Sequence, residues 1–373
     1  MKITEVETIP VSVPLDQRRM ITSSRGAHDT SPFLFVRVHT DEGLDGLGEV
    51  SCTPRWSGED SVTAAHVIGR YIAPQLAGQD PCAVARLTET IDAALVGHHF
   101  TKAAVEMALW DVAGKAAGLP VHRLLGGPTR ARVRTKFSIS GREPEQAAEI
   151  AAWALDQGFT AMKVKVGNGQ LSTDLERVAA VRSVVGPETL LGVDANGGWS
   201  RAAARIAIGR LAEHDIAFIE QPLAPRDLMG MAQLRAHAPI PIMADDAVGT
   251  PEDALAVVEH DAADVLSLYV GMAGGIGPAR RAAAIALAAG VGWTIGSNLE
   301  LGVGLAAHIH FAVSTPGLAD DVVPCDIISP FYYPELLVAA PLPIHAGWAA
   351  PTEEPGLGVQ LDLDRVAQYR EDR

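Results

Sequence analysis

The sequence predicts an α/β fold: a modified (β/α) barrel of the TIM type, preceded by an α+β domain. From about residue 130 to 320, short apolar runs alternate with alanine-rich helical segments, which is typical of a parallel sheet covered by helices. Seven or eight such units fit a barrel better than an open sheet. The pattern differs on either side, so we expect three regions: an α+β domain over 1–125, the barrel over 126–324, and a proline-rich segment over 325–373 that packs back on the first domain.

The first region begins with a sequence that is typical of β-strands. The run 33–38 is followed by a turn rich in Asp and Gly and then by the run 47–50, which predicts an antiparallel sheet. The segment 103–115 has apolar residues every three or four positions, as on a buried helix face, and Gly118 and Pro120 end that helix.

The barrel strands are predicted from seven apolar runs and a weaker eighth. They lie at 135–139, 161–166, 190–194, 216–220, 240–244, 265–268 and 292–295, with the eighth near 317–320. Helical segments lie between them, for example at 144–155, 202–213 and 280–289.

Composition excludes several classes of partner. The 373 residues include 45 acidic and 30 basic side chains, giving a net charge of −15, whereas nucleic-acid binding needs clustered lysine and arginine. No apolar run reaches the roughly 18 residues of a membrane span. The first residues lack a signal-peptide pattern, and the three cysteines are too scattered for a disulfide framework. We therefore expect a cytoplasmic protein with no nucleic-acid or membrane partner.

Three acids follow consecutive predicted strands. Asp194, Glu220 and Asp245 lie one strand–helix unit apart, so all three should reach the rim where barrel enzymes keep their chemistry. Carboxylates that converge in a low-dielectric mouth repel one another, and a divalent cation relieves this repulsion. Oxygen ligands without Cys or His favour Mg²⁺ or Mn²⁺ over zinc. The alternative is that these acids cap the helices that follow the strands.

Two lysines lie on one of these strands. Lys163 and Lys165 flank Val164, so the period of two places both ammonium groups on the interior face. Near a cation, burial and like charge should push both lysines toward neutrality, as a base that removes a carbon-bound proton requires. The alternative is a strand end where both lysines reach water.

These residues resemble a known family. The chain is similar to the enolase superfamily, in its muconate-lactonizing-enzyme-like branch, and the resemblance runs nearly end to end. The matching motifs are Lys163-Val164-Lys165, Asp194-Ala195-Asn196, Glu220-Gln221-Pro222, Met243-Ala244-Asp245-Asp246, Gly274-Gly275 and the helix 104–115.

The resemblance implies a capping domain made from both chain ends and a barrel mouth that binds Mg²⁺. It implies that Asp194, Glu220 and Asp245 are the metal ligands and that Asn196 orients the metal site. Lys165 would be the acid/base that exchanges the proton α to a carboxylate, with Lys163 in support and an enediolate held on the metal. Members of the family are commonly homo-oligomers.

One departure from the family pattern bears on the reaction. The branch usually carries a second lysine on the sixth strand, but this chain has Tyr269 there. A buried phenol is a poor base and a reasonable hydrogen-bond donor or acid, and a base role stays open if a nearby metal or ammonium group lowers its pKa. This favours chemistry on one face, either cycloisomerisation or syn loss of a β-leaving group, over two-base racemisation. The alternative is that Tyr269 is only a packing residue at the rim. Asp246-Ala247 also replaces the common Glu-Ser, and we assign no effect to it.

Three further residues are candidates for substrate contact. Glu300 follows the seventh strand and is expected to orient a lysine or bind substrate, or else to be an acid of a first helical turn. Arg25 and Trp56 lie in Ser- and Gly-rich loops of the first domain. There Arg25 would pair with a distal carboxylate, and Trp56 would stack on a ring or a cationic amine. The alternative is an ordinary surface loop.

The predicted function is therefore isomerisation or cycloisomerisation of a small carboxylate by α-proton abstraction. A dehydratase is the main rival, and an epimerase or racemase of an amino-acid derivative is the next. A rival of another class is a barrel that binds metal and has lost activity.

Overall fold

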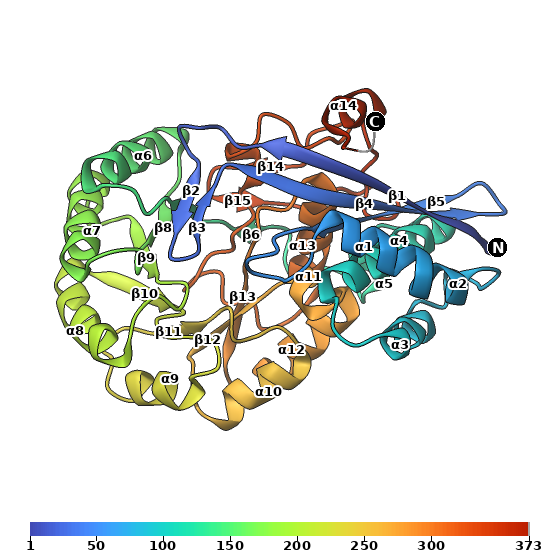
Figure 1. Cartoon of the computed structure of the whole chain (residues 1–373). Coiled ribbons are helices and arrows are strands. Elements are labelled where there is room, and N and C mark those ends of the chain that lie inside the picture. Colours follow the sequence, from blue (N-terminus) through green and yellow to red (C-terminus); the bar gives the residue numbers. More distant parts are fainter. Residues whose placement is uncertain (372–373) are drawn as a thin grey trace.

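The computed structural model describes residues 1–371, which form an α+β domain beside a barrel (Figure 1). The α+β domain has one antiparallel sheet in the order β1-β4-β5, a hairpin β2–β3, and a set of helices. Its elements are β1 (Ile3–Pro14), β2 (Ile21–Ser23), β3 (Gly26–His28), β4 (Thr30–Thr40), β5 (Asp45–Ser51), α1 (Ser61–Val67), the π-helix η1 (Ile68–Ile72), α2 (Ala73–Leu76), α3 (Val84–Ala94), α4 (His99–Ala117) and α5 (Val121–Leu124). The antiparallel pairing of β4 with β5 confirms the predicted sheet.

The barrel is built on a curled parallel sheet in the order β13-β12-β11-β10-β9-β8-β7, which confirms the predicted fold class. Its strands are β7 (Phe137–Ile139), β8 (Ala161–Lys165), β9 (Leu190–Asp194), β10 (Ile216–Glu220), β11 (Ile242–Ala244), β12 (Val265–Leu268) and β13 (Gly292–Ile295). The helices are α6 (Pro144–Gln157), α7 (Leu171–Val185), α8 (Arg201–Leu211), α9 (Leu228–Arg235), α10 (Pro251–Glu259), α11 (Val270–Ala273), α12 (Ile276–Ala288) and α13 (Gly302–Ser314). Figure 1 shows helices around the outside of these strands.

The eighth position of the barrel is irregular. Leu318 bridges Trp293 of β13, as the weak run near 317–320 predicts, and Cys325 bridges Thr135 on the other side of the gap. The backbone of Asp326 then donates to the carbonyl of Ile295 at 2.9 Å. The mouth end of the eighth position is therefore Cys325 and Asp326, several residues after the predicted run.

The C-terminal segment contacts both units. Its strands β14 (Ile344–His345) and β15 (Trp348–Ala349) form a small sheet with β6 (Val133–Arg134), the short strand that precedes the first barrel strand. Its helix α14 (Leu363–Tyr369) is followed by an antiparallel bridge from Arg370 to Val11 of β1. The predicted third region ends with residues 372 and 373, which lie outside the described residues.

Helix α4 is buried on nearly all sides, not on one face as its sequence pattern suggests. It lies between the antiparallel sheet and helices α11 and α12 of the barrel. Gly46 and Gly48 of β5 allow this, because a Cβ on either glycine would lie within 2.0 Å of a carbonyl oxygen of α4. None of the described helices, α4 included, is both long enough and apolar enough to span a membrane.

Two buried acids of the α+β domain bind the ends of barrel helices. Glu49 accepts hydrogen bonds from the backbone of Leu301 (2.7 Å) and Gly304 (2.9 Å) at the start of α13. Glu106 accepts from Ile276 and Gly277, both at 2.8 Å, at the start of α12. The free N–H groups of a helix start favour such acceptors. These contacts fix the α+β domain to one side of the barrel.

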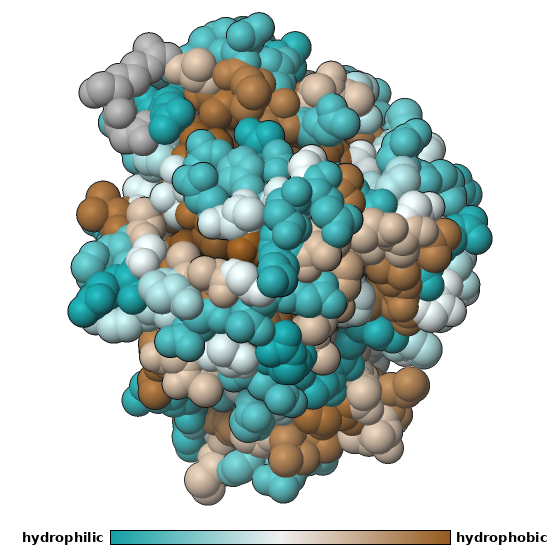
Figure 2. Space-filling model, turned by 90° about the vertical axis from the view of Figure 1, so that its right-hand side faces the viewer, coloured by the Kyte–Doolittle hydropathy of each residue, from teal (hydrophilic) through white to brown (hydrophobic). Residues whose placement is uncertain are grey.

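The outer face of the α+β domain carries a mixture of apolar and polar residues. Figure 2 shows hydrophobic residues interspersed with hydrophilic ones over this face. Single exposed apolar residues scattered over a protein surface are normal and carry no functional indication.

The first prediction concerns the contact between β5 and α4. Gly48→Ala should lower the free energy of unfolding by about 3 kcal/mol, because the new Cβ would lie 1.7 Å from the carbonyl oxygen of Ala104. Gly209→Ala is the control, since Gly209 lies in the exposed part of α8 with open space around it. The control should stabilise by about 0.5–1 kcal/mol. Urea unfolding measures both, and equal effects would contradict the packing argument.

The second prediction concerns Glu106. Burial raises its pKa from 4.5 to about 7, against the hydrogen bonds that it accepts. A carboxyl with a higher pKa in the folded state makes folding take up a proton, so its contribution to the free energy of unfolding decreases as pH rises from about 4.5 to 7. Relative to Glu106→Gln, the wild type should lose about 2 kcal/mol between pH 5 and pH 7.

Urea unfolding of both proteins at the two pH values tests this. Glu89→Gln, at an exposed position of α3, is the control and should show no such difference from the wild type. A wild type that gains stability over Glu106→Gln as pH rises would contradict the prediction.

Candidate active site

The three predicted rim acids lie at the carboxyl ends of consecutive strands. Lys165, Asp194 and Glu220 are register partners across β8, β9 and β10, and Asp245 directly follows β11. The side chain of Gln221 accepts hydrogen bonds from the backbone of Asp245 (2.9 Å), which fixes the turn after β11. All three acids are buried.

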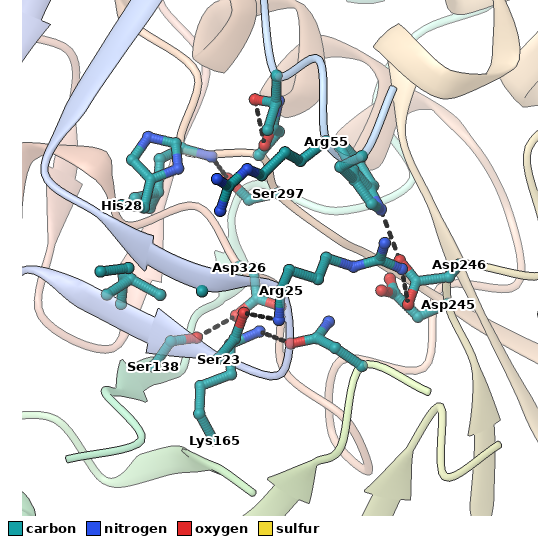
Figure 3. A pocket seen from close by; sticks show the side chains of 18 of the residues that line it. Ser23, Arg25, His28, Arg55, Ser138, Lys165, Asp245, Asp246, Ser297 and Asp326 are labelled. Atoms are coloured by element: carbon teal, nitrogen blue, oxygen red, sulfur yellow. Dashed lines mark hydrogen bonds and ion pairs between the residues drawn. The ribbon is translucent and has the colours of Figure 1, made fainter. Parts of the chain in front are cut away.

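A cavity of about 520 Å³ opens above this rim. The barrel contributes Lys163, Lys165, Asn196, Glu220, Asp245 and Tyr269 to its lining, and the α+β domain contributes Arg25 and Trp56. The β2–β3 hairpin reaches over the barrel, since the Ser24 hydroxyl donates to the carbonyl of Asn196 at 3.0 Å. Figure 3 shows Arg55 at the top and Lys165 at the bottom of this cavity, with Arg25 between them and directed toward Asp246.

Lys163 is hydrogen-bonded to two acids and lies 3.4 Å from Oδ2 of a third, Asp194. Its Nζ donates to both carboxylate oxygens of Glu220 (2.7 and 2.9 Å) and to Oδ2 of Asp326 (2.9 Å). Burial alone would lower the pKa of Lys163, but Asp326, Glu220 and Asp194 outweigh burial and raise its pKa well above 10.5. These acids therefore favour the charged form of Lys163, and the expectation that a bound cation pushes it toward neutrality stays a prediction.

Lys165 has fewer partners and more access to the cavity. Its Nζ donates to Asp194 Oδ2 (2.5 Å) and to the side-chain oxygen of Asn196 (2.9 Å). Its side chain is 14% exposed, against 4% for Lys163. Asn196, expected to orient the metal site, thus contacts this lysine directly.

The acids of the rim perturb one another. Burial and then Asp194 raise the pKa of Glu220 well above its usual range, whereas Lys165 and Lys163 outweigh burial and lower the pKa of Asp194. Burial and then Asp246 raise the pKa of Asp245 to about 7. Among residues 1–371, no three His, Cys, Asp or Glu side chains converge in the arrangement of a metal centre. The acids instead contact lysines and a tyrosine.

Tyr269 follows β12, across the mouth from β8. Its hydroxyl donates to Asp245 Oδ1 at 2.7 Å, and burial together with Asp245 raises its pKa well above 10. Its ring fits against Gly296, where a Cβ would lie 2.2 Å from the ring. The phenol is therefore a hydrogen-bond donor that points at a rim acid.

Asp326 and Lys136 are site residues that the sequence analysis missed. Asp326 Oδ2 lies 2.9 Å from the Nζ atoms of both Lys136 and Lys163, and Ser138 donates to its other oxygen at 3.2 Å. Lys136 is fully buried, two positions before Ser138 and directly before β7. Because Lys136 and Ser138 are two positions apart, the strand period could have placed both side chains on the interior face. The eighth position is irregular, so no such period could have identified Asp326.

Asp246 joins two loops of the α+β domain to the barrel. Its Oδ2 lies 2.8 Å from Nη2 of Arg25, and its Oδ1 accepts from Nε1 of Trp56 at 2.6 Å. The ring of Trp56 packs on Tyr269 and Phe100, each at 5.4 Å between centroids. Arg25 and Trp56 therefore lie at the cavity as expected, but both are engaged with the protein itself.

Glu300 lies apart from the cavity lining. Its carboxylate accepts from the Ser297 hydroxyl (2.6 Å) and the backbone of Asn298 (3.0 Å), and it lies 3.7 Å from Nδ1 of His308. It holds the turn before α13, and this turn presents Ser297 and Asn298 to the cavity.

A closed rim of acids and lysines above a parallel barrel, covered by loops of an α+β domain, defines the enolase class of barrel enzymes. Two family models match this chain. "Mandelate racemase / muconate lactonizing enzyme, N-terminal domain" matches residues 4–126, and "Enolase C-terminal domain-like" matches residues 145–366. The chain belongs to this family, in the muconate-lactonizing-enzyme-like branch of the enolase superfamily.

Its relatives are similar over nearly their whole length. Muconate cycloisomerase 1 of Rhodococcus opacus is 34% identical over 99% of this chain and 98% of its own. The L-Ala-D/L-Glu epimerase of Bacillus subtilis is 35% identical over 84% of this chain and 86% of its own. The structure of a muconate lactonizing enzyme from Pseudomonas fluorescens, complexed with muconolactone, matches with a TM-score of 0.95 and 31% identity over 99% of both chains.

The relatives also fix the broad class of protein. They include cycloisomerases, an epimerase and a racemase, which are isomerases, and a cis-3-hydroxy-L-proline dehydratase. The chain is therefore an enzyme, and the predicted isomerase class is confirmed, with a dehydratase present among its relatives as the runner-up.

The third prediction concerns Asp246. Asp246→Ala should loosen the loops at 20–30 and 53–58 together, because both are bound to this one carboxylate. We expect backbone amides in both loops to exchange hydrogen about 10-fold faster or more. This factor corresponds to the loss of one to a few kcal/mol, the usual contribution of a hydrogen bond to a charged group. Asp227→Ala removes a comparable pair with Arg201 away from the cavity and should leave both loops unchanged. Faster exchange in one loop alone would contradict the prediction that Asp246 holds both loops.

Proposed function

We propose that the enzyme removes the proton α to the carboxylate of a small acid, with Lys165 as the base. The observation that carries this is the difference between the two lysines. Lys163 hydrogen-bonds to Glu220 and Asp326 and lies 3.4 Å from Asp194. Lys165 borders the cavity and hydrogen-bonds to Asp194 and Asn196. A side chain that can turn to a substrate and exchange a proton is what general base catalysis requires.

We propose that Asp194, Glu220 and Asp245 hold a divalent cation, Mg²⁺ or Mn²⁺. The donor set suits such an ion by its chemistry and not by its present arrangement, since it consists of buried carboxylates, and burial followed by neighbouring acids raises the pKa of Glu220 and Asp245. When bound, the ion supplies positive charge that stabilises the substrate carboxylate as the α-proton leaves. Lys163 adds a second positive charge beside Glu220.

The position of Tyr269 favours cycloisomerisation within this chemistry. A second proton carrier on the opposite face is needed for racemisation, and the phenol on that side donates its proton to Asp245. Lys165 can remove and return a proton on one face, as addition and elimination of a carboxylate across a double bond require. Syn dehydration uses the same single face and is the second candidate. Epimerisation is the less favoured alternative.

The fourth prediction tests the base. With Mg²⁺ and muconolactone in D₂O, the enzyme should incorporate deuterium at one of the two α-hydrogens. Lys165→Met should slow this by about 10³-fold or more, the scale of a lost general base. Tyr269→Phe should keep single-face exchange, because it retains the ring and loses only the hydroxyl bond to Asp245. Mass spectrometry and NMR measure both.

The alternatives give different results in the same assay. Exchange that survives in Lys165→Met contradicts the assignment of the base. Deuterium on both faces contradicts single-face chemistry and favours an epimerase. Water loss from a β-hydroxy acid, without reaction of muconolactone, favours the dehydratase. No exchange with any carboxylate, at full Mg²⁺ binding, favours an inactive metal-binding barrel.

A further inference from the structure

A buried ion pair outside the cavity lies close to the end of β8. Asp174 and Arg177 are one helical turn apart near the start of α7, and their side chains lie 2.8 Å apart. These side chains are 2% and 3% exposed, and both lie outside the cavity lining. Burial of two charges is costly unless further hydrogen bonds satisfy both partners, so the groups that this pair binds are informative.

The guanidinium of Arg177 binds beside β8 at the point where β7 has ended. The N–H of Val166 donates to the carbonyl of Asp194 on β9 at 2.8 Å. In a trans peptide the carbonyl points the opposite way, so the carbonyl of Lys165 faces the β7 side. Strand β7 ends at Ile139, before it reaches Lys165. There Nη1 of Arg177 donates to the carbonyl of Lys165 at 3.2 Å.

The same guanidinium also binds the loop after β7. Its Nε donates to the carbonyl of Arg142, so one planar group joins this loop to the end of β8. A buried carbonyl without a donor is unfavourable, and an arginine offers several N–H groups in fixed directions. Arg177 therefore replaces the strand pairing that a longer β7 would supply to Lys165.

The carboxylate of Asp174 holds the turn that follows β8. Its Oδ2 accepts from the backbone N–H of Gly167 (2.8 Å) and from Nε1 of Trp199 (3.2 Å), which lies in the loop after β9. Gly167 has φ +76°, and a Cβ there would lie 2.8 Å from the carbonyl oxygen of Ala195, so this turn packs directly on the neighbouring strand end. The ion pair thus binds the mouth ends of β7, β8 and β9 together.

We propose that Arg177 and Asp174 are positioning residues for Lys165. They fix the two peptide groups that follow this residue, and thereby the direction in which its side chain leaves β8. The ammonium group of Lys165 then lies at the cavity, within hydrogen-bond distance of Asp194 and Asn196. A misplacement of about 1 Å can cost about 100-fold in rate. This inference rests on the proposed function, in which Lys165 is the base.

Arg182 is the matched control. It lies on the same helix and also donates to backbone carbonyls, but these belong to Thr189, His214 and Asp215. Those three residues precede β9 and β10, at the opposite end of the barrel from the mouth. Replacing Arg182 should therefore destabilise the same side of the barrel without displacing Lys165.

The experiment compares Arg177→Met with Arg182→Met in the deuterium exchange of muconolactone with Mg²⁺. Arg177→Met should lower kcat for exchange by about 10-fold or more, because the base is misplaced. KM should change by less than about 2-fold, since Arg177 does not line the cavity. Arg182→Met should lower the urea midpoint and leave both constants within about 2-fold of the wild type.

Amide hydrogen exchange gives a readout that needs no turnover. In Arg177→Met, the amides of residues 166–168 should exchange about 10-fold faster or more, because the bonds to Lys165 and Gly167 are weakened. The same amides should exchange at the wild-type rate in Arg182→Met. If Arg177→Met does not fold, both measurements are made on Arg177→Lys. Lysine keeps the charge beside Asp174 without the planar fork, so its losses should be smaller and in the same direction.

Several results would overturn the inference. Faster amide exchange in Arg177→Met with an unchanged kcat would make the pair purely structural. An equal loss of kcat in Arg177→Met and Arg182→Met would report a general loss of stability. A raised KM at unchanged kcat would place the effect in the cavity. Unchanged amide exchange at 166–168 would contradict the contact itself.

The proposed function fails separately. Its failure appears as deuterium exchange that survives in Lys165→Met, or as no exchange in the wild type. The positioning role then falls with it, while amide exchange at 166–168 still reports whether the pair holds the end of β8. Exchange that is lost in Lys165→Met but retained in Arg177→Met would keep the base and remove only the positioning role.

Discussion

The repulsion among buried acids at the barrel mouth is the constraint on which the rest of the site depends. Asp194, Glu220, Asp245 and Asp326 are all nearly inaccessible to water, and isolated charges in such a place are strongly unfavourable. The chain compensates them with amines inside the barrel, and Lys163 serves two acids at once. The two lysines therefore differ in their surroundings: the side chain of Lys163 is 4% exposed and that of Lys165 is 14% exposed.

Much of the fold and of this site could be predicted from sequence, because a barrel converts a regular strand–helix period into a ring of strand ends. That period alone placed Asp194, Glu220 and Asp245 on one rim. Asp326 could not be predicted as a site residue, because the eighth position has no strand pattern and is held by isolated β-bridges. The electrostatic balance at Lys163 could not be predicted from its own strand, because it depends on side chains from other strands, Asp326 among them.

The covering loops show the same limit. Their composition marked Arg25 and Trp56 as residues of the mouth, and they do lie there. Whether an arginine faces solvent, ligand or a buried acid depends on which barrel residue lies opposite, and Asp246 could not be placed opposite Arg25 from the sequence. The orientation of the α+β domain that sets this contact comes from Glu49 and Glu106 at the starts of α13 and α12.

The shared carboxylate of Asp246 has an evolutionary consequence. Because the hairpin and the loop at 53–58 end on the same side chain, neither can be exchanged for a longer or differently charged version without disturbing the other. Selection for a new substrate in this lineage would therefore act on both loops and Asp246 as one heritable unit. Descendants that change one of the three should carry matching replacements at the other two.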